Sequence, residues 1–154
     1  MARIWRATDA DAADVARLLG EFRDWWGYPG PSDASFRAGV ERLLADPNTA
    51  YLLGASGDGP ADGVCQLRFR YGLWHESEDC WFEDLYVSES ARRSGLGRAL
   101  VEAACDHARE RGCGRIQLDV NEANPAAVGL YESLGFSSWA DPPGGRNLFM
   151  GRRL

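Results

Sequence analysis

The segment that decides the fold runs from residue 83 to residue 98. It begins Glu83-Asp84-Leu85-Tyr86-Val87 and, after a short gap, continues Arg92-Arg93-Ser94-Gly95-Leu96-Gly97-Arg98. The first part ends a strand that we expect over Cys80–Val87, and the second opens a helix that we expect over Gly95–Arg111. Gly95 and Gly97 let backbone N–H groups approach a ligand closely, and a helix start carries positive partial charge. Together with its arginines, this turn is predicted to hold a pyrophosphate.

Other interpretations of this glycine-containing turn are limited. An ordinary turn between a strand and a helix also uses glycine, so the glycines alone do not establish a phosphate site. A dinucleotide-binding fingerprint is excluded because Leu100 stands where a third small residue is required. A Walker loop is excluded because the chain contains no Gly-Lys-Ser or Gly-Lys-Thr sequence.

Outward from this segment, hydrophobic periodicity predicts strands and helices along the whole chain. Strands are expected over Arg3–Ala7, Ala50–Ala55, Gly63–Tyr71, Cys80–Val87 and Arg115–Val120. Helices are expected from the capping pair Thr8 and Asp11 to Trp26, from a cap at Ser32 or Asp33 to Leu44, over Gly95–Arg111 and over Asn124–Leu134. The tail is expected to form a hairpin around residues 141–145. Residues 1–154 are therefore predicted to form one α/β (α+β) domain with a mixed sheet.

A second motif lies downstream and reads Asn124-Pro125-Ala126-Ala127-Val128-Gly129-Leu130-Tyr131, closing with Gly135-Phe136. It is similar to the Asn-x-x-Ala-x-x-Leu-Tyr-x-x-x-Gly-Phe signature of the GNAT superfamily of N-acetyltransferases. The Arg-x-x-Gly-x-Gly turn resembles the acetyl-CoA site of the same family, and the two motifs occur in the family's order. The resemblance spans about Trp81–Phe136. It implies the GNAT fold, a mixed, mostly antiparallel central sheet flanked by helices on both faces.

The resemblance implies acetyl-CoA as the cosubstrate and assigns residues to it. The end of the central strand, Leu85, Tyr86 and Val87, would pair with the pantetheine arm. The pyrophosphate would be held by the turn, that is by Arg92, Arg93, Ser94, Gly95, Leu96, Gly97 and Arg98. Asn124 and Ala127 would flank the cofactor on its other side, and Tyr131 would point at the thioester sulfur. The alternative for Tyr131 is an aromatic side chain packed in the core.

The expected reaction is acetyl transfer to a primary amine by direct attack in a ternary complex. The attacking amine, with a pKa of about 10.4, must lose a proton. Glu83 is the candidate base, directly or through a water, and Tyr131 would give a proton to the departing thiolate. The backbone N–H of Leu85 is the candidate donor to the oxyanion.

The position of Glu83 depends on the regularity of its strand. Alternation predicts that Glu83, Leu85 and Val87 share one face, on the cofactor side, while Asp84 and Tyr86 share the other. An ordinary, partly solvated strand carboxylate is the alternative interpretation of Glu83.

Acidic and aromatic side chains are candidates for the acceptor site. Glu83 and Asp84 would attract a cationic amine, although acidic runs commonly form a solvated face. Trp26, Tyr28 and Trp74 lie in segments that border the acceptor cleft in the family, where cation–π contact could hold an amine. A place in the hydrophobic core is the alternative for these aromatic residues.

The expected acceptor is a small cationic amine, because the sequence is most similar to the family's branch that acetylates diamines and thialysine. An aminoglycoside or a protein amine is the alternative acceptor. A non-catalytic module that binds acyl-CoA is the alternative from another functional class.

The charge balance limits the partners further. The chain has 17 basic residues, all arginine, against 23 acidic ones, which gives a net charge of -6. This charge argues against nucleic-acid and membrane partners, which normally need a basic face. Four cysteines in no metal-binding spacing predict that no metal is bound. An N-terminus without an apolar run predicts the cytoplasm, and the family resemblance adds a homodimer as the expected assembly.

Overall fold

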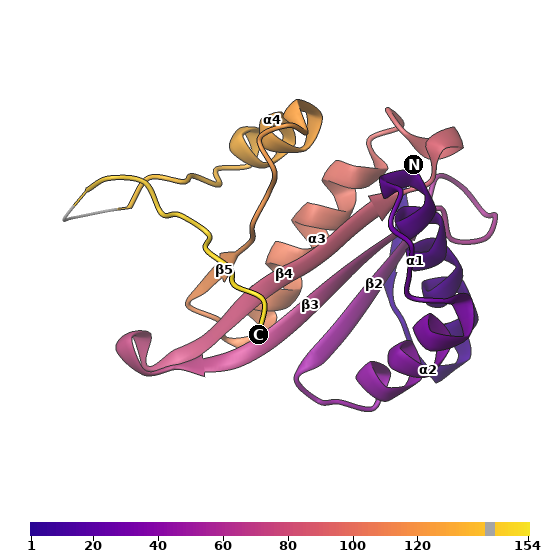
Figure 1. Cartoon of the computed structure of the whole chain (residues 1–154), viewed down its shortest axis with the longest axis horizontal. Coiled ribbons are helices and arrows are strands. Elements are labelled where there is room, and N and C mark those ends of the chain that lie inside the picture. The colour runs from indigo at the N-terminus through magenta and orange to yellow at the C-terminus, as the bar shows by residue number, and fades with distance from the viewer. Residues whose placement is uncertain (141–143) are drawn as a thin grey trace. The chain divides into compact units, whose positions relative to one another are not determined.

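The computed structural model describes residues 1–140 and 144–154 (Figure 1). These residues divide into two compact units, Met1–Leu118 and Asp119–Leu154, which are described separately. The sheet and the helices α1 to α3 belong to the first unit, and α4 and the tail belong to the second. None of the described helices is long and apolar enough to cross a membrane. One domain over residues 1–154 stays a prediction.

The sheet of the first unit has five strands in the order β1-β2-β3-β4-β5. Neighbouring strands are antiparallel from β1 to β4, and β5 is parallel to β4. Their bounds are Arg3–Arg6 for β1, Thr49–Ala55 for β2, Gly63–Gly72 for β3, Ser77–Val87 for β4 and Arg115–Gln117 for β5. The predicted mixed, mostly antiparallel sheet is therefore confirmed.

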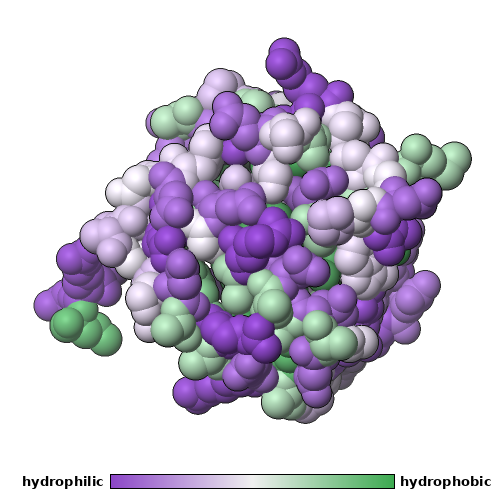
Figure 2. Space-filling model, turned by 90° about the vertical axis from the view of Figure 1, so that its right-hand side faces the viewer, coloured by the Kyte–Doolittle hydropathy of each residue, from purple (hydrophilic) through white to green (hydrophobic). Residues whose placement is uncertain are grey.

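Helices cover both faces of this sheet. On one face α1 (Ala12–Trp26) and α2 (Asp33–Leu44) pack against a core that includes Leu53 of β2. Side chains alternate across a strand, so the next residue, Gly54, faces α3 (Leu96–Arg111) on the other side. A Cβ atom at Gly54 would lie 2.7 Å from Ile4 Cδ1 and 2.8 Å from Leu96 Cδ1, so glycine here lets α3 pack closely without displacing either side chain. Figure 2 views the molecule from the side of α1 and α2, where hydrophilic residues are interspersed with hydrophobic ones.

The helix starts follow the capping signals of the sequence. The backbone N–H and the hydroxyl of Thr8 donate to Asp11 Oδ2 at 2.8 and 2.9 Å, and a short 3₁₀ helix over Asp9–Asp11 leads into α1. The backbone hydrogen bond from Thr8 is the main reason that the pKa of Asp11 is lowered. Ser32 caps α2 by accepting from the Ser35 N–H at 3.2 Å, which decides between the two predicted caps.

Two predicted strand boundaries are wrong. β4 begins at Ser77, three residues before Cys80, and a 3₁₀ turn over Leu73–His75 joins it to β3. The polar stretch can enter the sheet because Asp79, 3% exposed, accepts two hydrogen bonds of 3.0 Å from Arg115 on the neighbouring strand β5. β5 itself ends at Gln117, because its ladder with β4 covers only Asp79–Trp81.

The second unit contains one α-helix among its described residues, α4 over Pro125–Ser133. Gly135 follows it in the left-handed conformation, with φ of 87°, as its position after the helix predicted. In the tail, Trp139 and Arg146 form an antiparallel bridge. The expected hairpin turn includes residues 141–143, which lie outside the described residues.

Candidate active site

The predicted pyrophosphate turn connects β4 to α3 through a tight, left-handed bend. A 3₁₀ helix over Glu89–Ala91 precedes it. Arg93 has φ of 63° and Gly95 has φ of 87°, and α3 begins at the next residue, Leu96. Left-handed residues alternate here with residues of other backbone conformation. In such a turn successive backbone N–H groups can point toward one place and form a concavity that binds an anion.

The amides of this turn are the strongest feature of the site. The backbone N–H groups of Arg93, Ser94, Gly95 and Gly97 donate no hydrogen bond to any residue within 1–140 or 144–154. The Ser94 hydroxyl fixes the bend instead, since it donates to the Ala91 carbonyl at 2.7 Å. Four unsatisfied donors at a helix start favour a phosphate or pyrophosphate group.

The arginines of the turn differ in what they contact. Arg92 Nε donates to the Val87 carbonyl at 3.0 Å, and its guanidinium lies 4.7 Å from the centre of the Trp25 ring. This side chain therefore joins the end of β4 to α1, and the predicted phosphate contact of Arg92 stays a prediction without support from its geometry. Arg93 and Arg98 are exposed.

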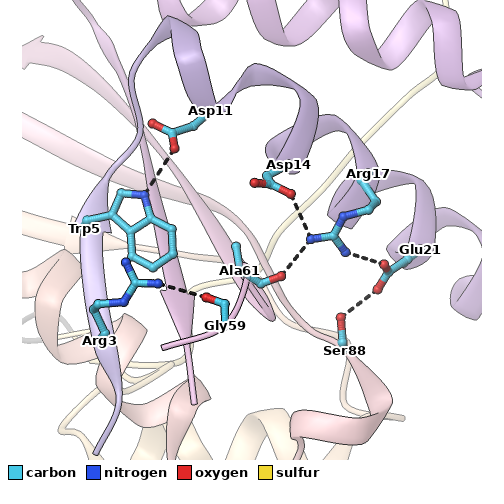
Figure 3. Close-up of polar contacts among 9 residues, drawn as sticks. All are labelled: Arg3, Trp5, Asp11, Asp14, Arg17, Glu21, Gly59, Ala61 and Ser88. Carbon is cyan, nitrogen blue, oxygen red and sulfur yellow. Dashed lines mark hydrogen bonds and ion pairs between the residues drawn. The ribbon is translucent and has the colours of Figure 1, made fainter. Parts of the chain in front are cut away.

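A polar network holds the entrance to this turn against α1 (Figure 3). Ser88, which follows β4, donates its hydroxyl hydrogen to Glu21 Oε2 at 2.7 Å. Arg17 pairs with the same Glu21 at 2.7 Å and donates to the Ala61 carbonyl at 2.8 Å. The loop before β3, the helix α1 and the end of β4 are thus tied together beside the turn.

The end of β4 offers a free backbone edge. β3 pairs with β4 along its whole length, whereas the ladder with β5 stops at Trp81. Within the part of the chain that the structure describes, no strand pairs with Leu85–Val87 on that second side. An extended ligand with amide groups can therefore form strand-like hydrogen bonds with these residues.

A β-bulge interrupts the strand at Glu83, so the predicted alternation is wrong. Phe82 lies opposite Leu67 and Asp84 lies opposite Gln66, which leaves Glu83 as an extra residue on β4. Burial raises the pKa of the Tyr51 hydroxyl, and the charges of Asp84 and Glu83 raise it further. Because Glu83 is the extra residue of the bulge, strand alternation no longer places it on one face with Leu85 and Val87.

A cavity of about 350 Å³ lies between α1, α2 and the sheet. Its wall includes Trp26 and Tyr28, whose rings stack with centroids 6.2 Å apart, and its floor includes Asp84. The structure therefore brings together three of the predicted acceptor residues. Glu83 is exposed next to the half-buried Asp84.

Trp74, the remaining acceptor candidate, is not among the residues that line this cavity. Its side chain is 94% exposed in the turn between β3 and β4, at the opposite end of β4 from Leu85. The fold of a single copy therefore does not place Trp74 at the acceptor site, because the β4 strand separates the two positions.

Two residues of the cavity floor, Tyr51 and Gln66, were not predicted from the sequence as site residues. Tyr51 is 1% exposed and Gln66 is 5% exposed, and both line the cavity. Gln66 lies between Cys65 and Leu67 in an otherwise apolar part of β3, and a buried amide in such a strand is the signal that could have identified it.

The predicted site residues of the second unit are Asn124, Ala127 and Tyr131, all in or next to α4. Asn124 Oδ1 accepts from the Ala127 N–H at 3.2 Å, so these two residues cap α4. Tyr131 is 8% exposed, and its ring packs edge-on against Phe136 at 5.7 Å. Their predicted contacts with acetyl-CoA stay predictions.

No three His, Cys, Asp or Glu side chains gather to hold a metal ion in the described parts of the chain. All four cysteines are free, and burial raises the pKa of Cys80 to about 12. A thiol with such a pKa is a poor nucleophile at neutral pH.

Comparison with known proteins identifies relatives over most of the chain. Residues 15–136 match the model of the acetyltransferase (GNAT) family. Streptothricin acetyltransferase of Streptomyces lavendulae is 33% identical over 110 residues, which cover 71% of this chain and 55% of that protein. The chain thus spans about half of that relative. Thialysine N-epsilon-acetyltransferase of Bos taurus is 28% identical over 156 residues, which cover 92% of this chain and 87% of that protein.

Solved structures share the fold. A protein from Arthrobacter sp. FB24 that is named as an acetyltransferase has a TM-score of 0.87 and 33% identity, and the match covers 99% of this chain and 96% of that one. The aminoglycoside N-acetyltransferase AAC(6')-Iy in complex with CoA has a TM-score of 0.79 at 21% identity, with 100% and 96% coverage. The predicted family resemblance and the predicted fold are both confirmed.

Proposed function

The chain belongs to the acetyltransferase (GNAT) family, and from this premise we propose that it transfers an acetyl group from acetyl-CoA to a primary amine. The observation that carries the proposal is the set of unsatisfied amides at Arg93, Ser94, Gly95 and Gly97. A pyrophosphate supplies the oxygen acceptors that these donors need. The free edge at Leu85–Val87 lies on the strand that leads into this turn, and it suits an amide-containing arm.

The chemistry assigned to the chain's own residues is proton transfer and charge stabilisation. When bound, acetyl-CoA supplies an activated acetyl thioester. Asp84 attracts the cationic acceptor, and Glu83 beside it takes a proton from the ammonium, directly or through a water, so that the free amine attacks the thioester. The Leu85 N–H stabilises the negative charge on the carbonyl oxygen, and Tyr131 protonates the leaving thiolate. Holding both reactants in one complex provides the proximity, so no covalent enzyme intermediate is needed.

A small cationic amine is the proposed acceptor class. Two relatives carry names that specify acetylation of a nitrogen: thialysine N-epsilon-acetyltransferase and, from Serratia marcescens, aminoglycoside N(6')-acetyltransferase type 1 at 26% identity. The acidic pair Glu83 and Asp84 beside an aromatic wall supports a cationic acceptor here. A homodimer in the cytoplasm, without nucleic-acid or membrane partners, completes the proposal.

The test separates transfer from binding. Calorimetry should show that acetyl-CoA binds, and an assay of free thiol release should show that primary amines accelerate CoA formation. If acetyl-CoA binds but no amine in a broad panel accelerates thiol release, the protein is a non-catalytic acyl-CoA-binding module. If acetyl-CoA does not bind, the assignment of the turn is wrong.

A further inference from the structure

Directly opposed positions on three strands place a phenol, an amide and a carboxylate in one row across the sheet. Tyr51 of β2 lies opposite Gln66 of β3, and Gln66 lies opposite Asp84 of β4. Opposed residues in a sheet project to the same face. All three side chains line the cavity under α1 and α2, so they form a continuous polar row on its floor. We call Tyr51, Gln66 and Asp84 the polar row.

Gln66, in the middle of the polar row, has hydrogen-bonding capacity that the protein does not use. Its side chain is buried, and its amide forms no hydrogen bond with any residue that the structure describes. It is also not among the fully sealed polar atoms that lack a partner, so the amide is accessible from the cavity. A buried amide of this kind needs a partner, which a molecule in the cavity can supply.

Tyr51 adds a second neutral donor beside it. Its hydroxyl likewise forms no hydrogen bond within residues 1–140 and 144–154. Burial and the nearby charge of Asp84 raise its pKa, so the phenol keeps its proton at neutral pH. Two neutral hydrogen-bonding groups therefore lie beside one carboxylate.

The remainder of the cavity wall is mostly apolar and contains few charged side chains. Phe22, Trp26 and Phe36 from α1 and α2 enclose the polar row from above. Among the described residues that line the cavity, Asp84 is the only carboxylate. The single guanidinium among them, Arg23, is already paired at 2.8 Å with Asp24 and with Asp33. The described lining therefore combines one carboxylate with a mostly apolar, aromatic wall.

We propose that the polar row selects an arylalkylamine-like acceptor and that Gln66 is a specificity-determining residue. This inference rests on the proposed function and narrows its substrate class. The acceptor's single ammonium lies at Asp84, its aromatic or apolar body lies between the aromatic walls, and a neutral hydroxyl or amide reaches Gln66 and Tyr51. Strands lie about 4.8 Å apart, so the row spans roughly 10 Å, which matches a compact monoamine. A polycationic acceptor carries more positive charges than Asp84 and the neighbouring Glu83 can pair, and the rest of it would lie against a mostly apolar wall.

The experiment compares amines that differ by one group. Values of kcat/KM are measured for tyramine, phenethylamine, spermidine and kanamycin, of which the first two differ only in a hydroxyl. The native protein should prefer tyramine to phenethylamine by about tenfold, the effect of one hydrogen bond. Gln66→Met keeps the side-chain length but removes the amide, and it should bring this ratio close to one. Thr49→Val removes a buried hydroxyl of the same sheet outside the cavity, and it should leave the ratio unchanged.

Binding gives a readout that is independent of catalysis. Calorimetric titration with tyramine measures binding at the cavity directly, and Gln66→Met should raise the Kd for tyramine about tenfold. If Gln66→Met fails to fold, Tyr51→Phe, which removes only a hydroxyl, should lower the tyramine preference instead.

Preference for spermidine or kanamycin, or an unchanged ratio in Gln66→Met, overturns the inference and leaves acetyl transfer intact. Absence of tyramine binding also overturns it. If none of the four amines is acetylated but another amine of the broad panel is, the inference fails and the proposed function stands. If acetyl-CoA binds and no amine of the broad panel is acetylated, both fail.

Discussion

Asp84 lies directly opposite Gln66 in the pairing of β4 with β3, whereas Glu83, one residue earlier, has no opposite position. The bulge gives these two neighbouring carboxylates different surroundings, because Asp84 is half-buried in the cavity wall and Glu83 is exposed beside it. Carboxylates in different surroundings can take different roles. We therefore expect Asp84 to hold the ammonium of the acceptor and Glu83 to take its proton.

Substitution of the two carboxylates should separate these roles. Glu83→Gln removes the proton acceptor, so kcat should fall by about a hundredfold while the affinity for acetyl-CoA is kept. Asp84→Asn removes the charge that holds the amine, so KM for the amine should rise more than kcat falls. Steady-state kinetics in both substrates measure the difference. An equal loss of kcat in both variants would contradict the division of roles.

Arg92 should act on stability more than on cofactor binding. Its guanidinium contacts the Val87 carbonyl and the Trp25 ring, so Arg92→Met should lower the free energy of unfolding by about 1–2 kcal/mol. The Kd for CoA should change less than twofold. Urea denaturation and calorimetry measure the two quantities, with Arg42→Met at an exposed position of α2, away from the turn, as the control. Tenfold weaker CoA binding at unchanged stability would instead establish the predicted phosphate contact of Arg92.

A negative charge introduced at Gly97 should test whether the amides of the turn bind the pyrophosphate. Glu at this position is favourable for the first turn of a helix, so Gly97→Glu should fold. Its carboxylate should repel the pyrophosphate and weaken CoA binding by at least a hundredfold, as measured by calorimetry. Gly97→Gln has nearly the same size without the charge and should bind more tightly than Gly97→Glu. Native affinity in Gly97→Glu would show that the pyrophosphate lies elsewhere.

The local parts of the fold could be predicted because their signals are local. Thr8 with Asp11 and Ser32 mark helix starts through hydrogen bonds within three residues, and the glycine-containing turn depends on its own backbone angles. The start of β4 could not be predicted in the same way. Asp79 looks like a loop residue until Arg115, from a strand far along the chain, neutralises it.

In the candidate site, too, the features that depend on pairing between distant strands could not be predicted. Alternation assigned Glu83 to the face of Leu85, but a bulge depends on the pairing with β3 and is invisible in the sequence of β4 alone. The polar row likewise arises from the register of three strands. Tyr51 and Gln66 are 15 residues apart along the chain, and only the sheet places them side by side.

Tyr131 is the candidate proton donor, and its hydroxyl can be removed without loss of packing. The ring is buried against Phe136, so Tyr131→Phe should keep the free energy of unfolding within about 1 kcal/mol. Turnover should fall by about a hundredfold because the leaving thiolate loses its acid, and CoA affinity should be unchanged. Phe136→Leu is the control for disturbed packing at the same ring. An unchanged kcat in Tyr131→Phe would remove Tyr131 from the catalytic residues.

The ion pair between Glu78 and Arg111 should make stability depend on pH in the acid range. Arg111 Nε lies 2.5 Å from Glu78 Oε2 and its Nη2 lies 3.0 Å from Oε1, which joins the end of α3 to the start of β4. The hydrogen bonds from Arg111 lower the pKa of Glu78 from its ordinary value of 4.5. A lowered pKa means that the folded state favours the charged form, so the stabilisation is fully present above pH 4.5 and is lost as the pH falls through the folded pKa.

Glu78→Gln should therefore reduce the free energy of unfolding by about 1 kcal/mol at pH 7. The difference from the native protein should shrink as the pH falls well below 4.5, because the native carboxyl is then protonated as well. Urea denaturation at several pH values measures this convergence. Glu102→Gln removes an exposed carboxylate that lies 3.9 Å from Arg98, and it should change stability little at either pH. A stability difference for Glu78→Gln that stays constant down to acid pH would show that the ion pair does not cause it.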